Sequence, residues 1–425
     1  MSQLKHLYDL FLSSKGVCID TRKLKPGQLY IAIKGDNFDG NKFALDALQK
    51  GALACIVSDK SIVNEQCYVV EYTLETLQQL ANHHRRQFDI PVIGITGSNG
   101  KTTTKELIYS VLSKEKIVNA TVGNLNNHLG VPLTILSWSA NTEIAIVEMG
   151  ANHVGEIADL CKIAEPTLGL ITNIGKAHLE GFGGLEGVKK GKSELFAWLA
   201  KSNGKVFYNI DDDLLSTTVS QFQLASIHSY GKSERANTQA EKLGQTFLEL
   251  LYDKEVIKTQ LVGDYNFYNA VAAMAIGEEF NISTPNIKNA LENYNPTNNR
   301  SQVVEIGNNK FILDAYNANP TSMKMAIENL QNQEAENKAL ILGDMLELGD
   351  YSKKEHQAIL DMLQVFNADN IVLVGPEFEQ VKSNDFTFVK SNVEAKEWLT
   401  DKAFNNTTVL VKGSRGIALE KVLER

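Results

Sequence analysis

The sequence predicts a three-domain α/β protein: a small mixed α/β N-terminal domain, a central domain on a mostly parallel sheet, and a C-terminal Rossmann-like α/β domain. Three observations predict it. Short apolar runs alternate with helical segments along the middle of the chain, as in parallel sheets covered by helices. One run ends in a glycine-containing turn that leads into a helix. An Asn- and Pro-rich stretch at 293–299 then precedes another α/β unit.

We expect the domains to span residues 1–85, 86–298 and 299–425. A chain of 425 residues has the length of two to four domains. Its net charge of −9 argues against nonspecific nucleic-acid binding, so we expect no nucleic-acid partner. No apolar run approaches the roughly 20 residues of a membrane span. The four cysteines show no metal-ligand spacing, and no secretory signal precedes the first helix, so we expect a cytoplasmic protein.

The N-terminal unit contains two predicted strands, at 29–33 and 54–57, and a helix between them at 42–50. Two polar clusters interrupt it, at 20–22 and 34–40. Gly, Asp and Asn are typical turn residues, so the residue types alone predict turns at both places.

The central domain begins with a buried strand at 91–95, followed by a turn and a helix from Lys101. The turn and helix start read Gly97-Ser98-Asn99-Gly100-Lys101-Thr102-Thr103. Glycine lets the backbone approach an anion, and the helix N-terminus attracts negative charge. Lys101 would reach the outer phosphates and the Thr102 hydroxyl would bind Mg²⁺. The usual template has glycine where Ile95 stands, but the pattern still predicts nucleotide binding.

Later strands of this domain also end in polar residues. The strand at 144–147 leads to Glu148, and the strand at 168–172 leads to a loop containing His178. Ligands of parallel sheets bind at the carboxyl ends of the strands. A carboxylate that ends a strand beside a phosphate-binding loop is a typical Mg²⁺ ligand. For His178, a structural role and a metal or phosphate role stay equally open.

Other polar positions have a structural and a functional interpretation. The loop at 121–128 contains Asn126 and Asn127, which suit a left-handed turn or recognition of a polar substrate. Asn266 and Asn269 share one helix face and could cap the helix or read a base edge. The predicted helix at 189–200 carries several lysines, and its residue types alone do not single one out.

The last unit has predicted strands at 311–313, 339–342, 371–374 and 409–411, the last followed by a final helix. Polar residues follow these strands, and the run after the fourth is Lys412-Gly413-Ser414-Arg415-Gly416. Because carboxyl ends of parallel strands share an edge, we expect this domain to face the glycine-containing turn across a cleft.

These residues resemble the Mur ligases, ATP-dependent amide-bond-forming enzymes of bacterial cell-wall synthesis. The family motif T-G-[ST]-x-G-K-[ST] is matched from Thr96 to Thr102. The family's shared Lys, Glu, His, two Asn, Arg and Asp fall on Lys101, Glu148, His178, Asn266, Asn269, Arg300 and Asp314. Local phrases at 123–127, 148–152, 177–183, 316–320, 342–349 and 411–415 are most similar to the branch that adds D-alanyl-D-alanine to a UDP-N-acetylmuramoyl tripeptide. The D-N-P-R string of the branch that adds the third residue is absent.

The resemblance implies a central P-loop ATPase domain, the cofactors ATP and Mg²⁺, and a set of site residues. It assigns catalysis to Lys101, Glu148, His178, Lys192 and Arg300. It assigns metal binding to Thr102, Glu148, His178 and Lys192, with Lys192 carbamoylated. Lys192 stands in the sequence Lys192-Ser193-Glu194, whereas the family has glycine at the middle position. It assigns ATP binding to residues 97–103, Asn266, Asn269, Arg300 and Asp314. It assigns substrate binding to Thr21, Arg22, Lys34, Gly35, Asn126, Asn127, Tyr316, Asn317 and Asn319.

The implied reaction joins D-alanyl-D-alanine to the tripeptide through an acyl phosphate in a monomeric enzyme of peptidoglycan synthesis. Two alternatives stay open. One is another ligase of the Mur or folylpolyglutamate type that adds a single amino acid. The other is a P-loop nucleotide-binding module that ligates nothing. The set of seven residues across two predicted domains counts against the second alternative.

Overall fold

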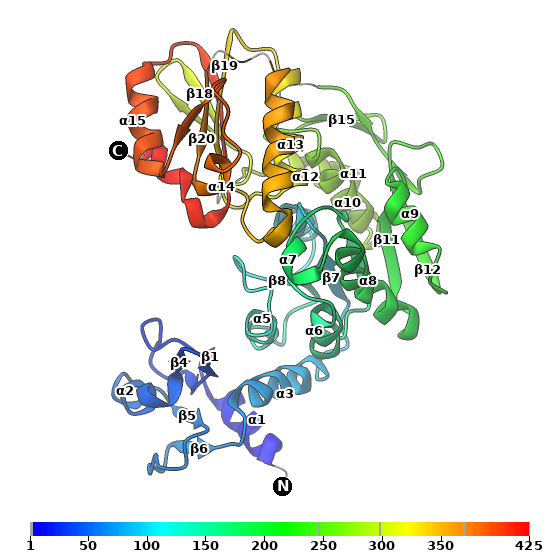
Figure 1. The fold of residues 1–425 in the computed structure, drawn as a ribbon. Helices are drawn as coiled ribbons and strands as arrows, with labels where there is room; N and C mark the ends of the chain where they lie inside the picture. Colours follow the sequence, from blue (N-terminus) through cyan, green and yellow to red (C-terminus); the bar gives the residue numbers. More distant parts are fainter. Residues whose placement is uncertain (1–2, 245–246, 297–298, 367, 369, 425) are drawn as a thin grey trace.

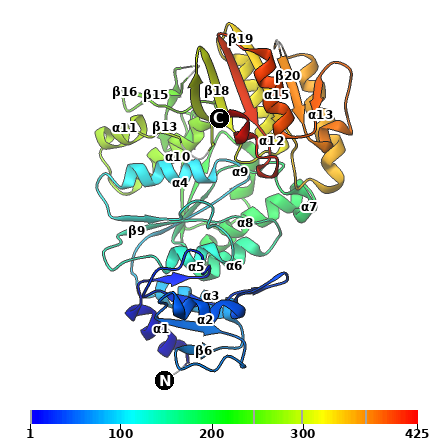
Figure 2. The same cartoon turned by 90° about the vertical axis from the view of Figure 1, so that its left-hand side faces the viewer.

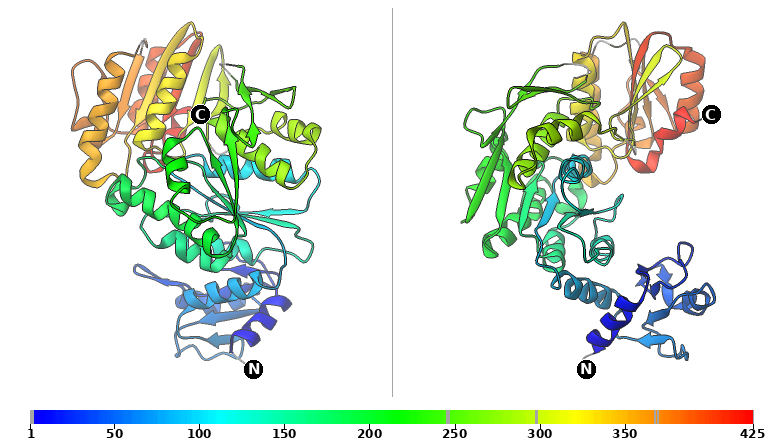
Figure 3. Two further views of the ribbon diagram at one scale, coloured as in Figure 1. Left: turned by 90° about the vertical axis from the view of Figure 1, so that its right-hand side faces the viewer. Right: turned by 180° about the vertical axis from the view of Figure 1, so that it is seen from behind.

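The computed structural model describes residues 3–244, 247–296, 299–366, 368 and 370–424. Its three largest sheets follow one another along the chain, and the predicted three-domain α/β architecture is confirmed. The N-terminal domain lies at one end, the central domain in the middle and the C-terminal domain at the other end (Figure 1). The two further views of Figure 3 show the same order. The predicted domain boundaries stay predictions, and residues 297–298 and both chain ends, 1 and 425, lie outside the described residues.

The N-terminal domain is a four-stranded parallel sheet in the order β1-β2-β5-β6. Its elements are α1 (Gln3–Ser13), β1 (Val17–Cys18), β2 (Leu29–Ile31), β3 (Lys34–Gly35), β4 (Phe38–Asp39), η1 (Gly40–Phe43), α2 (Ala44–Gln49), β5 (Ala54–Val57), β6 (Cys67–Val69) and α3 (Thr73–Arg85). The predicted turn at 34–40 is the short hairpin of β3 and β4. The strand predicted at 54–57 has those bounds in the structure.

The central domain contains a seven-stranded parallel sheet in the order β13-β12-β11-β10-β7-β9-β8. Its elements are β7 (Val92–Thr96), α4 (Lys101–Leu112), β8 (Val118–Ala120), α5 (Gly130–Ile135), β9 (Ile144–Glu148), α6 (Glu156–Ala164), β10 (Leu168–Ile171), α7 (Leu179–Phe182), α8 (Leu185–Lys201), β11 (Lys205–Asn209), α9 (Asp213–Val219), β12 (Ser226–Gly231), β13 (Thr238–Gln239), β14 (Glu241–Lys242), β15 (Glu249–Tyr252), β16 (Glu255–Lys258), α10 (Asn266–Glu279) and α11 (Thr284–Glu292). Strands β14 to β16 form a separate antiparallel sheet that the sequence did not predict.

Strand β7 is buried on both faces of the large sheet, which explains its unbroken apolar sequence. Ile93 and Ile95 belong to the core formed with α4 and α10, whereas Val92 belongs to the core on the opposite face. Figure 2 shows α4 and α10 on one side of β9 and α5 and α6 on the other. Because β7 lies between β10 and β9, the ends of these three strands bring together the loops that follow Thr96, Glu148 and Ile171.

The C-terminal domain has a six-stranded sheet in the order β17-β18-β22-β19-β20-β21, in which β17 and β18 are antiparallel and the other neighbours are parallel. Its elements are β17 (Gln302–Ile306), β18 (Asn309–Asp314), α12 (Pro320–Asn332), β19 (Asn337–Gly343), η2 (Gly349–Tyr351), α13 (Ser352–Gln364), β20 (Asn370–Val374), α14 (Pro376–Glu379), β21 (Thr387–Val389), α15 (Asn392–Lys402), β22 (Thr407–Lys412), η3 (Arg415–Ile417) and η4 (Leu419–Leu423). The prediction of a final α-helix is wrong. Two 3-10 helices stand there, separated by Ala418 in a left-handed conformation that interrupts regular helix geometry.

The central and C-terminal domains touch through polar side chains. Lys176 Nζ donates a hydrogen bond to Glu355 Oε1 at 2.7 Å, and the Lys176 amide donates to Thr321 Oγ1. His178 Nδ1 lies 2.7 Å from Glu347 Oε2. These contacts hold the loop after β10 against α12, α13 and the loop after β19. Along the described residues, none of the helices combines the length and the apolar composition that crossing a bilayer requires.

The N-terminal domain joins the central domain through a buried polar contact. Tyr8 Oη and His84 Nδ1 are 2.9 Å apart, and His84 Nε2 lies 3.3 Å from the Trp138 carbonyl oxygen. The His84 ring also packs edge-on against Phe11 and Phe88. Burial lowers the pKa of His84, so the folded protein favours the neutral imidazole.

This burial predicts a pH dependence of stability. An unfolded histidine has a pKa of about 6.5. Below that pH the unfolded chain binds a proton that His84 resists in the folded state, so folding loses free energy as the pH falls. We expect the melting temperature of the wild type to fall between pH 8 and pH 5.5 by more than that of His84→Gln, measured by differential scanning fluorimetry. His6→Gln, at an exposed site, is the control and should fall like the wild type. Equal falls in the wild type and His84→Gln would contradict the prediction.

Candidate functional site

The turn between β7 and α4 depends on two glycines. Gly97 and Gly100 have φ values of +145° and +79°, a region that disfavours residues with a Cβ atom. A Cβ at Gly97 would lie 2.0 Å from Thr172 Oγ1, and one at Gly100 would lie 2.7 Å from Asn269 Oδ1. The turn is therefore pressed between the end of β10 and the start of α10, with its amides fixed at the N-terminus of α4.

Lys101 folds back over this turn. Its Nζ donates to the Gly97 carbonyl at 2.7 Å and to the Ser98 carbonyl at 3.3 Å. Burial lowers the pKa of Lys101, the Glu148 carboxylate raises it, and the Arg300 guanidinium lowers it. The electrostatic influence of Arg300 on Lys101 means that the C-terminal domain brings this cation close to the turn between β7 and α4.

Glu148 lies at the end of β9, and only one of its two carboxylate oxygen atoms accepts hydrogen bonds. Its Oε1 accepts hydrogen bonds from Asn126 Nδ2 at 2.8 Å and Thr102 Oγ1 at 3.2 Å. Its Oε2 is buried without a hydrogen-bond partner among the described residues, with Lys105 Nζ 3.8 Å away. A buried carboxylate oxygen without a donor fits a divalent cation, and Mg²⁺ prefers oxygen ligands.

A cavity of about 580 Å³ lies between the central and C-terminal domains. The predicted site residues that line it are residues 98–103, Asn126, Asn127, Glu148, His178, Asn266, Asn269, Arg300, Asp314, Tyr316, Asn317 and Asn319. Gly97, also predicted to bind ATP, is not among the lining residues, although its carbonyl accepts a hydrogen bond from Lys101 Nζ. The expected cleft between the two domains is thus present in the structure.

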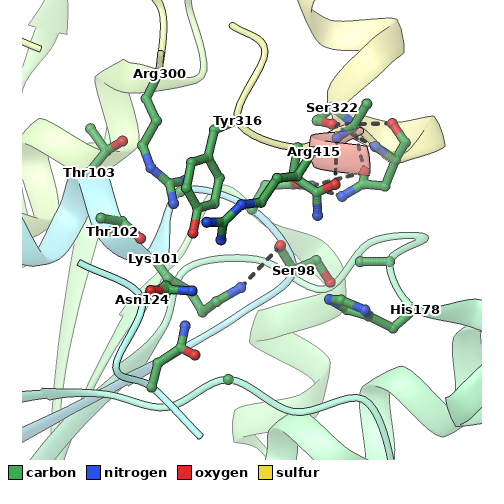
Figure 4. A pocket seen from close by; sticks show the side chains of 18 of the residues that line it. Ser98, Lys101, Thr102, Thr103, Asn124, His178, Arg300, Tyr316, Ser322 and Arg415 are labelled. Atoms are coloured by element: carbon green, nitrogen blue, oxygen red, sulfur yellow. Dashed lines mark hydrogen bonds between the residues drawn. The ribbon is translucent and has the colours of Figure 1, made fainter. Parts of the chain in front are cut away.

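Arg300 and Asp314 enter this cavity from the C-terminal domain. The Arg300 guanidinium lies 3.7 Å from the centre of the Tyr316 ring, and Figure 4 shows it close to Thr102 and Thr103. Asp314 accepts a hydrogen bond from Lys412 Nζ at 2.5 Å and one from the Ser301 amide at 3.2 Å. Both residues therefore share one cavity with Lys101.

The two asparagines at the start of α10 bond to each other. Asn269 Nδ2 donates to Asn266 Oδ1 at 2.9 Å, and Asn266 Nδ2 donates to the Val262 carbonyl at 2.8 Å. Each amide nitrogen carries two hydrogens and each amide oxygen two lone pairs. Asn266 consequently keeps one donor and one acceptor for a ligand, while Asn269 Oδ1 accepts from Thr104 Oγ1.

Asn319 connects the two walls of the cavity. Its Nδ2 donates to Asn99 Oδ1 at 2.7 Å across the domain boundary. Its Oδ1 accepts from the Ser322 amide and so caps α12. The residue thus holds the turn between β7 and α4 of one domain against a helix start of the other.

His178 lies in the cavity but has a carboxylate partner. It has a φ of +52°, and its imidazole faces Glu347 of the C-terminal domain. Figure 4 shows it on the opposite side of Lys101 from Thr102. Among the described residues, no three His, Cys, Asp or Glu side chains gather as a metal site. Any cation here would take much of its coordination from a ligand.

Lys192 is absent from the cavity lining. It is 1% exposed, and its Nζ donates to the Ala151 carbonyl at 3.1 Å behind the cavity wall. Burial, and secondly the charge of Lys101, lower the pKa of Lys192 well below its ordinary value. Its neighbours Lys189 and Lys190 are half-buried and exposed.

The predicted residues of the N-terminal domain do not join this cavity either. Thr21, Arg22, Lys34 and Gly35 are absent from its lining, as is every other residue before Ser98. The Arg22 side chain is exposed and pairs with Asp20, whose pKa it lowers to about 2. The structure leaves these four residues on a domain of their own.

The sequence interpretation assigned no role to several cavity residues, including Lys412, Ser414, Arg415 and Glu347. The polar run at 412–416 directly follows the last strand, so the signal was present. It lacked a recognisable chemical pattern. Glu347 could be found only from the fold, because its partner His178 belongs to another domain.

Three family models match the chain in succession. They are "Mur ligase family, catalytic domain" over residues 13–90, "Mur ligase middle domain" over 95–277, and "Mur ligase, glutamate ligase domain" over 299–415. The chain is 35% identical to the UDP-N-acetylmuramoyl-tripeptide–D-alanyl-D-alanine ligase of Bacillus subtilis, a match that covers 96% of the chain and 92% of that relative. It is 33% identical to the ligase of the same name from Escherichia coli, with the same coverage of both chains.

Solved structures give the same result. The structure of MurF ligase from Thermotoga maritima in complex with ADP matches with a TM-score of 0.87 and 29% identity, over 98% of this chain and 97% of that one. The MurF structure from Acinetobacter baumannii matches with a TM-score of 0.86 and 31% identity, over 97% and 96% of the two chains.

The glycine geometry predicts the effect of one substitution. In Gly97→Ala the new Cβ would displace the Thr172 hydroxyl, which donates to the Asn99 carbonyl and so supports the turn. We expect affinity for a nucleoside triphosphate to fall at least about tenfold, measured by isothermal titration calorimetry. Gly307→Ala is the matched control, since Gly307 also has a left-handed φ, of +61°, but its Cβ would meet nothing within 4 Å. Unchanged affinity in a folded Gly97→Ala protein would contradict the prediction.

Proposed function

The chain belongs to the Mur ligase family, and from this premise we propose that it joins D-alanyl-D-alanine to UDP-N-acetylmuramoyl tripeptide with hydrolysis of ATP to ADP and phosphate. The product is the UDP-N-acetylmuramoyl pentapeptide of peptidoglycan synthesis. The observation that carries this proposal is the shared cavity, in which Lys101 of one domain and Arg300 and Asp314 of another face the same space.

The reaction needs concentrated positive charge. A carboxylate is a poor acyl donor until one oxygen becomes a phosphate leaving group, so the tripeptide carboxylate must first attack the γ-phosphate of ATP. Two anions then have to approach each other, and fixed cations lower the cost of that approach. Lys101 and Arg300 supply such cations. The two-domain enclosure would keep water from the acyl phosphate until the amine of D-alanyl-D-alanine attacks it.

The nucleotide would be held by the glycine-containing turn and by the start of α10. Residues 97–103 would surround the β- and γ-phosphates with backbone N–H groups, which suits the positive end of α4. The remaining donor and acceptor of Asn266 suit an adenine edge, and Asn269 supports Asn266. Asp314 would face the ribose side of the nucleotide.

A bound Mg²⁺ would neutralise phosphate charge. Thr102 Oγ1 and the unpartnered Glu148 Oε2 are the oxygen groups that fit it. The sparse protein ligands agree with a Mg²⁺ ion that takes other ligands from phosphates and water. His178 and a carbamoylated Lys192 would serve a second ion, with Glu347 orienting the imidazole.

The environment of Lys192 supports carbamoylation. The reaction joins a neutral lysine amine to CO₂ and releases one proton, so it needs an unprotonated Nζ. Burial favours that form, as the lowered pKa of Lys192 indicates. The resulting lysine carbamate carries anionic oxygen atoms, which suit a hard cation such as Mg²⁺.

The N-terminal domain would bind the UDP end of the substrate through Thr21, Arg22, Lys34 and Gly35. This assignment rests on the family resemblance, since these side chains lie away from the cavity. The domain spans of 1–85, 86–298 and 299–425, the monomeric state and the cytoplasmic location stay predictions of the same kind.

The identity of the acceptor can be tested directly. We expect ADP release to require both a UDP-muramoyl tripeptide and D-alanyl-D-alanine, and we expect mass spectrometry to find the tripeptide mass increased by the dipeptide minus one water. Assays with the lysine- and the diaminopimelate-containing tripeptides would identify the donor. Addition of a single amino acid instead would favour the other ligase type. ATP binding indifferent to both substrates would favour a non-ligating module.

The lysine assignment has its own test. Lys192→Ala should lower ligation at least about a hundredfold, and added formate or acetate should restore part of it by supplying the missing carboxylate oxygen. Lys190→Ala is the control, because that lysine is exposed, and it should keep wild-type activity. Melting temperatures would verify that both variants fold. Full activity of Lys192→Ala would contradict the assignment.

A further inference from the structure

Four lysine and arginine side chains line the cavity, and the two lysines have hydrogen-bond partners. Lys101 donates to carbonyls of its own turn, and Lys412 pairs with Asp314. Arg300 stacks on the Tyr316 ring at 3.7 Å. The fourth cation, Arg415, has no hydrogen-bond or ion-pair partner within the described part of the chain, and its guanidinium lies 5.5 Å from the Tyr316 ring centre.

The backbone that carries Arg415 is firmly fixed by the preceding residue. The Ser414 amide donates to the Asp344 carbonyl at 3.0 Å, and Ser414 Oγ donates to the Ala318 carbonyl at 3.2 Å. The Leu346 amide in turn donates to Ser414 Oγ at 2.9 Å. Ser414 is therefore bonded to two segments of the C-terminal domain, the loop after β18 and the loop after β19, and Arg415 extends from this fixed base into the cavity.

The Tyr316 ring separates the two arginines. Figure 4 shows Arg300 on the side of Thr102 and Thr103, at the start of α4, and Arg415 on the other side of the ring. The nucleotide side thus already contains Lys101, the helix N-terminus and Arg300. Arg415 stands on the side that is left for the peptide substrates.

We propose that Arg415 binds the free carboxylate of the incoming dipeptide and thereby holds its amine toward the acyl phosphate, an inference that rests on the proposed function. The dipeptide has one permanent anion, its C-terminal carboxylate, which takes no part in bond formation. Bringing that anion into the cavity requires a charged or hydrogen-bonding partner. A guanidinium matches a carboxylate with two parallel hydrogen bonds. Arg300 also has no hydrogen-bond or ion-pair partner among the described residues, but it stacks closely on Tyr316 on the side of α4, so Arg415 is the cation that the nucleotide side leaves for this carboxylate.

The test compares two acceptors that differ only in this charge, D-alanyl-D-alanine and its C-terminal amide, D-alanyl-D-alaninamide. For the wild type we expect kcat/KM to be roughly 10- to 100-fold higher for the carboxylate form, the range of a charge-assisted hydrogen bond. Arg415→Met should lower kcat/KM for the carboxylate form to that of the amide, through KM for the acceptor, and leave KM for ATP unchanged. Arg415→Lys should keep part of the preference, because it keeps the charge without the paired geometry.

Arg235→Met is the matched control, since Arg235 is exposed in the loop after β12 and absent from the cavity. It should keep the wild-type preference. A preference that persists in Arg415→Met, or is absent from the wild type, would overturn the inference. An equal loss of kcat/KM for both acceptors in Arg415→Met would also overturn it. So would a higher KM for ATP in this variant, because Arg415 would then act on the phosphates. If the wild type used no dipeptide at all, the proposed function itself would fail.

Discussion

The candidate site depends on several cations that two domains hold close together in one cavity. The chain carries a net charge of −9, yet four lysine and arginine side chains converge between two domains. Burial is the main cause of the lowered pKa of Lys101, and the nearby Arg300 guanidinium lowers that pKa further. The fold holds the cations in place with carbonyls, an aromatic face and Asp314. A polyanionic ligand would reduce the electrostatic repulsion among these cations, and this reduction would favour binding of the ligand.

The positions of these cations depend on contacts between the domains. Asn319 bonds to Asn99, His178 faces Glu347, and Lys176 pairs with Glu355, all across the same boundary. Apolar side chains of both domains also belong to one buried cluster, among them Leu179, Phe182, Met323 and Leu348. The boundary therefore combines polar contacts with apolar packing, which suits the proposed need to exclude water from the reacting groups.

Local signals in the sequence identified the fold class and the start of α4, whereas the family resemblance supplied cavity residues such as Arg300 and Tyr316. A buried strand, two glycines and a helix start occur within a dozen residues of Gly97, and the strand ends before Glu148 and Asp314 are equally short signals. The errors have non-local or subtle causes. The sheet β14–β16 is a short meander without a strong period, and the final 3-10 helices depend on the left-handed Ala418. Glu347 and Arg415 gain their meaning from residues of another segment, which only the folded chain brings together.

The absence of N-terminal residues from the cavity follows from the size of the proposed substrate. A diphosphate, a sugar and three peptide residues together form a long ligand, and an extended peptide alone adds about 3.3–3.6 Å per residue. One end can consequently bind a separate domain while the carboxylate reaches the cavity. The orientation of that domain then matters more than its contact with the cavity. The buried contact of Tyr8, His84 and Trp138, together with the bonds from Arg85 and Arg86 to Ala164 and Glu165, holds this orientation at the root of the N-terminal domain.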